Sequence, residues 1–297
     1  MATDGIVGSV AGLWRFPVKS MRGEPLEQAE VTGQGLLGDR AYALVDADTG
    51  KVVSAKSVKL FPDMLGCRAA FVEPPRSGRE IPPVRIVLPD GTSVASSSSD
   101  AERALSAHFR RSVKLARAAP ENFTIDQYHP DVEGIDPAGY RDTVTESKLG
   151  SAFFAQAGMA SPVPVGAFFD LFPVSVLTSS TLDRLTELEP RSRFDQRRFR
   201  MNLIVRAAPA GFVENDWVGR ELAVGDTLRL KIALPDPRCV MTTLAQEDLP
   251  RDNDILRALV RHNKIQVGGA GQYPCVGVYA VVQAAGTIRT GDRVALV

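Results

Sequence analysis

The chain has 297 residues, 44% of them hydrophobic, which is enough to bury one large core or two modest ones. Lysine plus arginine number 35, as do aspartate plus glutamate, so no overall charge attracts nucleic acid or an anionic membrane, and any anion site has to be local. No apolar run reaches the roughly 20 residues of a membrane-spanning helix, and the N-terminus lacks the pattern of a secretion signal. The expected compartment is therefore the cytoplasm.

The first region, residues 1–116, reads as short strands with β-branched or alternating apolar residues, separated by turns. We expect strands at 6–16, 42–46, 67–72 and 84–88, followed by a helix from Asp100 to about Phe109. This pattern predicts a small α+β domain built as a barrel or rolled sheet.

Residues 117–170 show no sustained periodicity and are expected to form an irregular connector with a short helix near 150–156. The second region, 171–297, predicts strands separated by two helices at 179–187 and 252–261. The expected strands are 174–177, 203–206, 221–224, 227–234, 276–284 and 293–297. Gly-Asp pairs at 225–226 and 291–292 precede strands, as tight barrel corners do. The predicted fold class is mixed α/β, mostly β, with a second barrel in this region.

The three cysteines, Cys67, Cys239 and Cys275, are an odd number without CxxC spacing. This argues against a disulfide framework, a zinc ribbon or a cysteine-held iron–sulfur cluster. Most single cysteines are small buried hydrophobic residues. Cys239 differs because the neighbouring cation Arg238 favours the thiolate, which is the form that binds metals.

Three further stretches carry groups that suit an anion. They are Pro-Val-Lys-Ser at 17–20, Gly-Leu-Leu-Gly-Asp-Arg at 35–40, and the arginine-rich run 194–203. Glycines allow a close approach of backbone to a ligand, and arginine and lysine bind phosphate. Each stretch alone also has an ordinary explanation as a turn, a surface ion pair or a solvated face. Spacing by itself leaves the function open.

Taken in order, these motifs, the run Asp-Pro-Arg-Cys-x-x-Thr-Thr at 236–243 and Gly-Asp-Arg-Val at 291–294 resemble the MOSC family with its N-terminal barrel domain. The resemblance covers nearly the whole chain. The layout is most similar to that of the amidoxime-reducing mitochondrial proteins and their bacterial relatives.

This resemblance implies a molybdenum-pterin cofactor (Mo-molybdopterin) whose metal is bound by the pterin dithiolene and by Cys239. A soft thiolate suits the metal, and basic and hydroxyl groups suit the phosphate and polar ring edge of the pterin. Asp236 is a candidate proton donor. The residues that match cofactor contacts are Lys19, Ser20 and Arg40 from the first region, and Thr178, Ser179, Arg200, Asn202 and Arg238 from the MOSC domain.

The implied activity is an oxidoreductase that removes oxygen from an N-hydroxylated substrate, such as an amidoxime or hydroxylamine. Electrons would come from a separate donor protein of ferredoxin, flavoprotein or cytochrome type, because some relatives carry a C-terminal ferredoxin domain and this sequence ends at Val297 without one. Some relatives also have an aromatic residue where this chain has Val276, so the pocket wall there is expected to differ.

Two alternatives remain open from the sequence. A sulfur-carrier or cofactor-handling protein would hold a persulfide on Cys239, as the related domain of molybdenum-cofactor sulfurases suggests. Those enzymes carry a pyridoxal-phosphate desulfurase domain, for which this chain has no room. A scaffold protein would account for the fold but would leave Arg238, Cys239 and the arginine run without a role.

Overall fold

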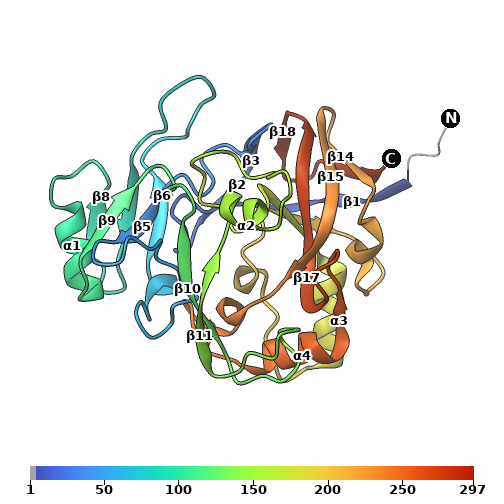
Figure 1. Ribbon diagram of the computed structural model, residues 1–297. Helices are drawn as coiled ribbons and strands as arrows, with labels where there is room; N and C mark the ends of the chain where they lie inside the picture. Colours follow the sequence, from blue (N-terminus) through green and yellow to red (C-terminus); the bar gives the residue numbers. More distant parts are fainter. Residues whose placement is uncertain (1–4) are drawn as a thin grey trace.

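The computed structural model describes residues 5–297, and its centre is a closed barrel of seven strands (Figure 1). In order around the barrel these are β12 (Val174–Thr178), β13 (Leu203–Arg206), β1 (Gly5–Arg15), β19 (Arg293–Leu296), β14 (Glu221–Val224), β15 (Leu228–Pro237) and β17 (Gln272–Ala284). β17 pairs with β12 and closes the barrel. Only β12 and β13 are parallel to each other. Inward-facing Val, Leu and Ile side chains fill the barrel, as in other small barrels.

The first strand of the chain belongs to this barrel. β1 pairs with β13 on one side and with β19 on the other. β2 (Glu24–Leu26) extends the sheet from β1, and β3 (Gln28–Thr32) lies between β4 (Gly35–Leu36) and β18 (Gly286–Arg289). β1 and β3 are thus hydrogen-bonded to β19 and β18, which come from the far end of the sequence. A boundary near residue 116 remains a prediction, and the strand pairing runs across it.

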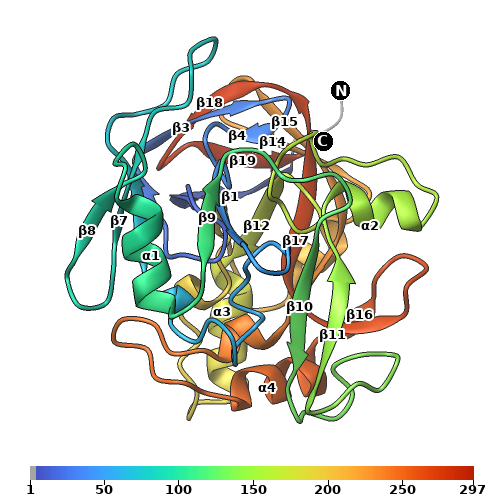
Figure 2. The ribbon, with the colours of Figure 1, turned by 60° about the vertical axis from the view of Figure 1, so that its left-hand side comes forward.

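A second core lies beside the barrel and is built around residues 40–116. It contains the pair β5 (Ala43–Asp46) and β9 (Val113–Ala116), and the sheet of β6 (Arg68–Phe71), β7 (Val84–Val87) and β8 (Ser93–Ala95). Helix α1 (Ala101–Phe109) packs against this group, as Figure 2 shows. Val240, Met241 and Leu244, which are distant in sequence, complete the core. The two cores are therefore joined through the segment that follows Cys239.

Two helices, α3 (Ser179–Leu188) and α4 (Asp254–His262), cover the barrel at one end (Figure 1). Leu185 of α3 and Leu256 of α4 share a cluster with Leu177 and Ile204 of the barrel strands. β16 (Lys264–Gln266) pairs with the edge of β17. The short 3-10 turns are η1 (Met64–Gly66), η2 (Gln196–Arg198), η3 (Val213–Trp217) and η4 (Val240–Thr243).

The predicted fold class is confirmed, because the chain is mostly β, has a few helices and contains a closed β-barrel. The expectation of an irregular connector at 117–170 was wrong in one part, since β10 (Thr124–His129) and β11 (Thr143–Lys148) form a hairpin there. β11 alternates between partly buried and exposed positions, but its partly buried residues, Thr143, Thr145 and Ser147, are polar. The hydrophobic pattern of the hairpin therefore does not show the alternation of a strand. The short helix α2 (Ser151–Gln156) lies where it was expected.

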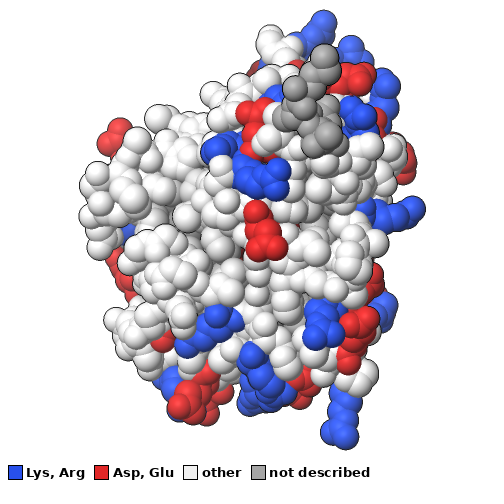
Figure 3. Space-filling model, turned by 90° about the vertical axis from the view of Figure 1, so that its right-hand side faces the viewer, with Lys and Arg blue, Asp and Glu red and all other residues white. Residues whose placement is uncertain are grey.

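Acidic and basic side chains are interspersed on the face shown in Figure 3, in agreement with the balanced composition. Within residues 5–297, no helix is long and apolar enough to cross a membrane.

Candidate functional site

Cys239 lies two residues beyond the end of β15, at the N-cap position of η4. It is partly exposed, whereas Cys67 and Cys275 are buried. Burial raises the pKa of Cys67 to about 12 and also raises the pKa of Cys275, so both thiols stay protonated at neutral pH. Cys239 is therefore the cysteine that is open to a ligand.

Arg198 fixes the turn that carries Cys239 through hydrogen bonds to backbone carbonyl oxygens. This side chain is only 1% exposed, and its guanidinium donates to the carbonyl oxygens of Arg193 (3.0 Å), Thr242 (3.3 Å) and Pro250 (2.9 Å). Val240 in the same turn packs into the second core. Because both sides of the turn are fixed, Cys239 has a defined position between the two cores.

A group of buried and partly buried charges surrounds this position, and we call it the cationic cluster. It consists of Lys19, Arg40, Lys56, Arg200 and Arg238 with the carboxylates Asp39, Asp170 and Asp236.

Asp170 joins the two lysines of the cluster. Lys19 Nζ pairs with Asp170 and donates to the carbonyl oxygen of Phe168 at 2.8 Å, and Lys56 Nζ lies 2.8 Å from the other carboxylate oxygen. Burial opposes ionisation of Asp170, but the two lysines hold its pKa well below its usual range. Burial also opposes the charge of Lys56, whose pKa is nevertheless raised by the charges of Asp170 and Cys239. Lys56 thus links the lysine group to the cysteine.

Two arginines stack on the ring of Phe16, with Arg40 at 4.6 Å and Arg200 at 4.3 Å from the ring centroid. Arg40 pairs with Asp39, and Arg200 donates to the carbonyl oxygen of Met21 at 2.6 Å. Burial and the charge of Arg40 lower the pKa of Arg200 to about 9, so it remains a cation at neutral pH.

Arg238 lies in the same cluster and pairs with Asp236 at 2.5 Å. Burial raises the pKa of Asp236 to about 6, although Arg238 opposes this effect. Burial would lower the pKa of Arg238, but the charges of Asp236, Tyr279 and Cys239 raise it. The Nε atom of Arg238 and the Oδ1 atom of Asp236 are buried without a hydrogen-bond partner.

Three of the residues predicted to contact the cofactor hold left-handed backbone conformations. The φ angles are 65° for Ser20, 49° for Arg40 and 56° for Arg200. Such conformations cost energy in residues other than glycine and persist where the surrounding structure enforces them, often at functional sites. The strain therefore coincides with the cationic cluster.

Three other residues that were predicted to contact the cofactor, Thr178, Ser179 and Asn202, form hydrogen bonds within the protein. The Thr178 hydroxyl donates to Glu214 at 2.5 Å, and the Ser179 hydroxyl donates to the Ala207 carbonyl oxygen at 3.2 Å. The Asn202 amide donates to Asp39 at 2.9 Å and accepts from Ser175 at 3.1 Å. These polar groups are already occupied, and Asn202 orients Asp39 within the cationic cluster. A direct contact of these three residues with a cofactor stays a prediction.

Sequence reasoning missed Lys56, Asp170 and the aromatic platform Phe16. Asp170 had a usable signal, because it is a single carboxylate within the apolar run 167–172 and such a charge needs a partner when it is buried. Lys56 lies in the polar segment Ser54–Ser57, which resembles a surface turn.

Across residues 5–297, no three His, Cys, Asp or Glu side chains are arranged to hold a metal ion.

Comparison with known proteins agrees with this architecture. Residues 7–109 match the MOSC N-terminal beta barrel domain, and residues 166–295 match the MOSC domain. The human mitochondrial amidoxime reducing component 2 is 25% identical over 312 residues, covering 97% of this chain and 83% of the relative. The human component 1 is 24% identical over 317 residues, covering 98% and 83%. Among solved structures, the YUAD protein from Bacillus subtilis aligns with a TM-score of 0.45 and 11% identity over 97% of this chain and 94% of that chain.

The two matched domains occur in the expected order, and the curated relatives align over nearly the full length. The chain therefore belongs to the MOSC-domain proteins that carry the MOSC N-terminal beta barrel domain.

Proposed function

We propose that this protein is a molybdenum-cofactor-dependent reductase in which the Cys239 thiolate binds the metal and the cationic cluster binds the anionic pterin. The observation that carries this proposal is the position of a single accessible thiol beside a buried excess of positive charge. The relatives named amidoxime reducing components support a reductase of N-hydroxylated compounds.

The residues of the site suit such a cofactor. Five cations face three carboxylates in the cluster, which leaves an excess of two positive charges where a phosphate carries two negative ones. The buried Nε atom of Arg238 lacks a partner and has a donor to offer. Lys19 and Arg40 come from the N-terminal domain and Arg200 and Arg238 from the MOSC domain, so the cofactor would lie between the domains.

Reduction of an N-hydroxylated compound breaks the N–O bond, consumes two electrons and two protons, and releases the oxygen as water. When bound, the molybdenum cofactor would supply the redox change. Asp236 suits the role of proton donor because burial raises its pKa to about 6, close to neutral pH. Arg238 orients Asp236 through their ion pair.

We further propose that a separate protein of ferredoxin, flavoprotein or cytochrome type supplies the electrons. A cytoplasmic location stays a prediction, and the curated relatives are named as mitochondrial. Reduced viologen should drive turnover by the purified protein, whereas NADH alone should not. Turnover with NADH and no added protein would show that a second redox site exists.

The decisive variant is Cys239→Ala, with Cys67→Ala and Cys275→Ser as matched controls. Metal and pterin content is measured by mass spectrometry, and reductase activity with benzamidoxime and reduced viologen. We expect Cys239→Ala to lose activity and to weaken molybdenum binding, while both controls keep them. Full activity in Cys239→Ala would falsify the assignment. Wild-type protein without molybdenum but with labile sulfur on Cys239 would instead support the sulfur-carrier alternative.

A further inference from the structure

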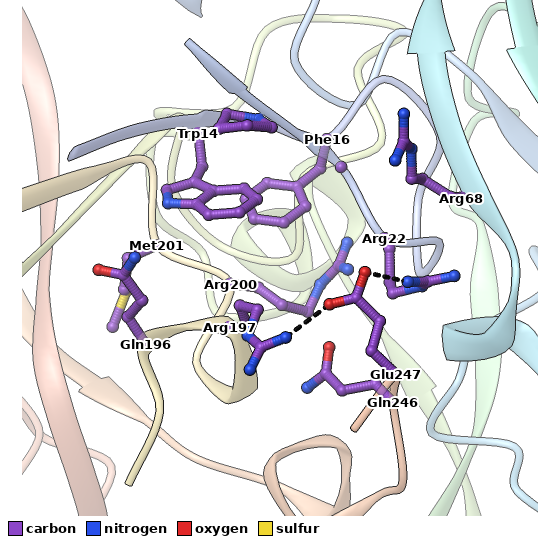
Figure 4. A pocket seen from close by; sticks show the side chains of 12 residues that line it. Trp14, Phe16, Arg22, Arg68, Gln196, Arg197, Arg200, Met201, Gln246 and Glu247 are labelled. Carbon is purple, nitrogen blue, oxygen red and sulfur yellow. Dashed lines mark hydrogen bonds and ion pairs between the residues drawn. The ribbon is translucent and has the colours of Figure 1, made fainter. Parts of the chain in front are cut away.

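A second cavity lies between the two domains and does not include Cys239. Its volume is about 210 Å³ (Figure 4). Trp14, Phe16, Arg22 and Arg68 line it from the N-terminal domain, and Arg197 and Glu247 from the MOSC domain. Phe16 and Arg200 form the wall that this cavity shares with the cationic cluster.

Cations outnumber carboxylates in the lining. It contains four arginines, at positions 22, 68, 197 and 200, and one carboxylate, Glu247, although Arg197 also pairs with Asp195 and Asp248 beside the cavity. Figure 4 shows the Glu247 carboxylate between the guanidinium groups of Arg22 and Arg197. The distance between Arg197 Nη1 and Glu247 Oε2 is 2.6 Å. Glu247 also has a left-handed backbone conformation, with φ at 50°. The Glu247 carboxylate therefore lies between two arginines, where an anionic ligand would bind, and it belongs to a residue with a strained backbone.

Two further donors at this cavity have no partner. Gln246 is 5% exposed, and its Nε2 atom is buried without a hydrogen bond. The Nε atom of Arg22 is also unpaired. Buried donors are nearly always satisfied in folded proteins, so two of them beside one cavity indicate a missing acceptor.

The opposite wall is aromatic and flat. The rings of Trp14 and Phe16 are stacked, with centroids 6.5 Å apart and an angle of 17° between their planes. A stacked pair offers a planar apolar surface to another ring. The cavity therefore combines an aromatic surface with a cluster of donors.

We propose that this cavity binds a small aromatic carboxylate. Its carboxylate would displace Glu247 from Arg22 and Arg197 and accept a hydrogen bond from Gln246, while its ring lies against Trp14. This proposal does not rest on the proposed reductase function, because neither Cys239 nor Lys19 lines the cavity.

Benzoate is the probe, and its affinity for the full-length protein is measured by calorimetric titration. We expect Gln246→Leu to weaken benzoate binding about tenfold, because a hydrogen bond to a charged group is lost. The same variant should be at least as resistant to heat as the wild type, because it removes a buried unsatisfied donor. Glu247→Gln should bind benzoate more tightly, since the competing charge is gone. Trp14→Leu should weaken benzoate but leave the affinity for inorganic phosphate unchanged.

Arg257→Ala, on α4 and outside this cavity, is the matched control and should bind benzoate as the wild type does. Equal benzoate affinity in Gln246→Leu and wild type, or no binding to either, would overturn the proposal. Phosphate binding as tight as benzoate binding would contradict the aromatic part. Loss of benzoate binding in Cys239→Ser would mean that the probe occupies the cofactor site instead.

Discussion

Two buried polar groups lie against the same barrel and differ in how their charge is balanced. In the cationic cluster, five cations face three carboxylates. In the second group, which we call the Glu214 cluster, the Glu214 side chain accepts hydrogen bonds from the hydroxyls of Thr178 at 2.5 Å and Thr181 at 2.7 Å. Among residues 5–297, Glu214 has no ion pair with a lysine, arginine or histidine.

The sequence places Thr178 in the same cofactor-binding set as Lys19, Arg40 and Arg200. The charge balance of the two clusters separates Thr178 from these three residues. Burial raises the pKa of Glu214, so the carboxyl tends toward its neutral form, and hydroxyl donors then suffice. Lys19, Arg40 and Arg200 outnumber the carboxylates beside them, Asp39 and Asp170, although burial lowers the pKa of Lys19. Glu214 is held by hydroxyl groups, and its Oε1 atom is buried without a hydrogen-bond partner, so this cluster has no surplus positive charge. A cluster with surplus positive charge has affinity left for an anion.

The largest effect is expected for the cations. If Lys19 and Arg40 bind one phosphate-bearing cofactor, Lys19→Ala or Arg40→Ala should lower cofactor retention about ten- to a hundredfold, because each removes a charge-assisted hydrogen bond. Pterin content after gel filtration measures this. Arg257→Ala, a partly exposed helix position, is the control and should retain cofactor and change stability by less than about 0.5 kcal/mol. Equal pterin content in all three variants would rule out a contribution from the N-terminal domain.

Asp170→Asn tests the charge balance in cofactor-free protein. Removing the carboxylate leaves Lys19 and Lys56 unneutralised, and we expect a loss of about 2 kcal/mol at pH 7. This is less than for a fully buried pair, because the Asp170 side chain is 31% exposed. Its lowered pKa adds stability above the pKa of the unfolded state, near 4, which is lost as the pH falls further. Urea unfolding should therefore show a smaller difference between variant and wild type at pH 3 than at pH 7.

Thr178→Val tests the opposite property of the Glu214 cluster. Loss of the hydroxyl leaves Glu214 with Thr181 as its remaining hydroxyl donor, and it also removes the N-cap oxygen of α3, which accepts from the Thr181 N–H at 3.3 Å. Together these losses should cost about 1.5 kcal/mol of unfolding free energy. Cofactor retention should not change. A loss of pterin in Thr178→Val without a loss of stability would return Thr178 to the cofactor site.

The smallest effect is the pH response of Glu214→Gln. The raised pKa of Glu214 contributes stability that is complete below the pKa of the unfolded state, about 4.3, and is lost as the pH rises through the folded value. Glutamine does not titrate. From pH 5 to pH 8 the stability of the variant relative to wild type should therefore rise. A constant difference across this range would show that Glu214 is already ionised at pH 5.

Much of the barrel was predictable because its strands are apolar and bounded by Gly-Asp corners. Val174–Thr178 and Leu203–Arg206 lie within a residue of their expected ranges. The hairpin of β10 and β11 was missed because neither of its faces is continuously buried. The pairing of β1 with β19 could not be predicted either, because hydrophobic periodicity indicates where strands are but not which strands pair.

For the site as well, the sequence indicated which residues matter but not how they are arranged. The motifs indicated Lys19, Arg40, Arg200 and Arg238, and the structure gathers them in one cluster. The sequence treated Arg197, Arg198 and Arg200 as one basic run, but Arg197 pairs with acidic surface residues and Arg198 holds backbone carbonyl groups. Neighbours in an irregular segment point in different directions, so their roles could not be separated without coordinates.

The position of β1 between β13 and β19 bears on how the chain is made. The ribosome releases β1 long before Arg293–Leu296, the strand that completes its pairing. Until that strand is made, one edge of β1 has unpaired backbone groups, which are prone to pair with other chains. Closure of the barrel joins segments almost 300 residues apart in sequence, and such long-range closure is slow. The free edge of β1 is therefore the part of the unfinished barrel where aggregation is expected to begin.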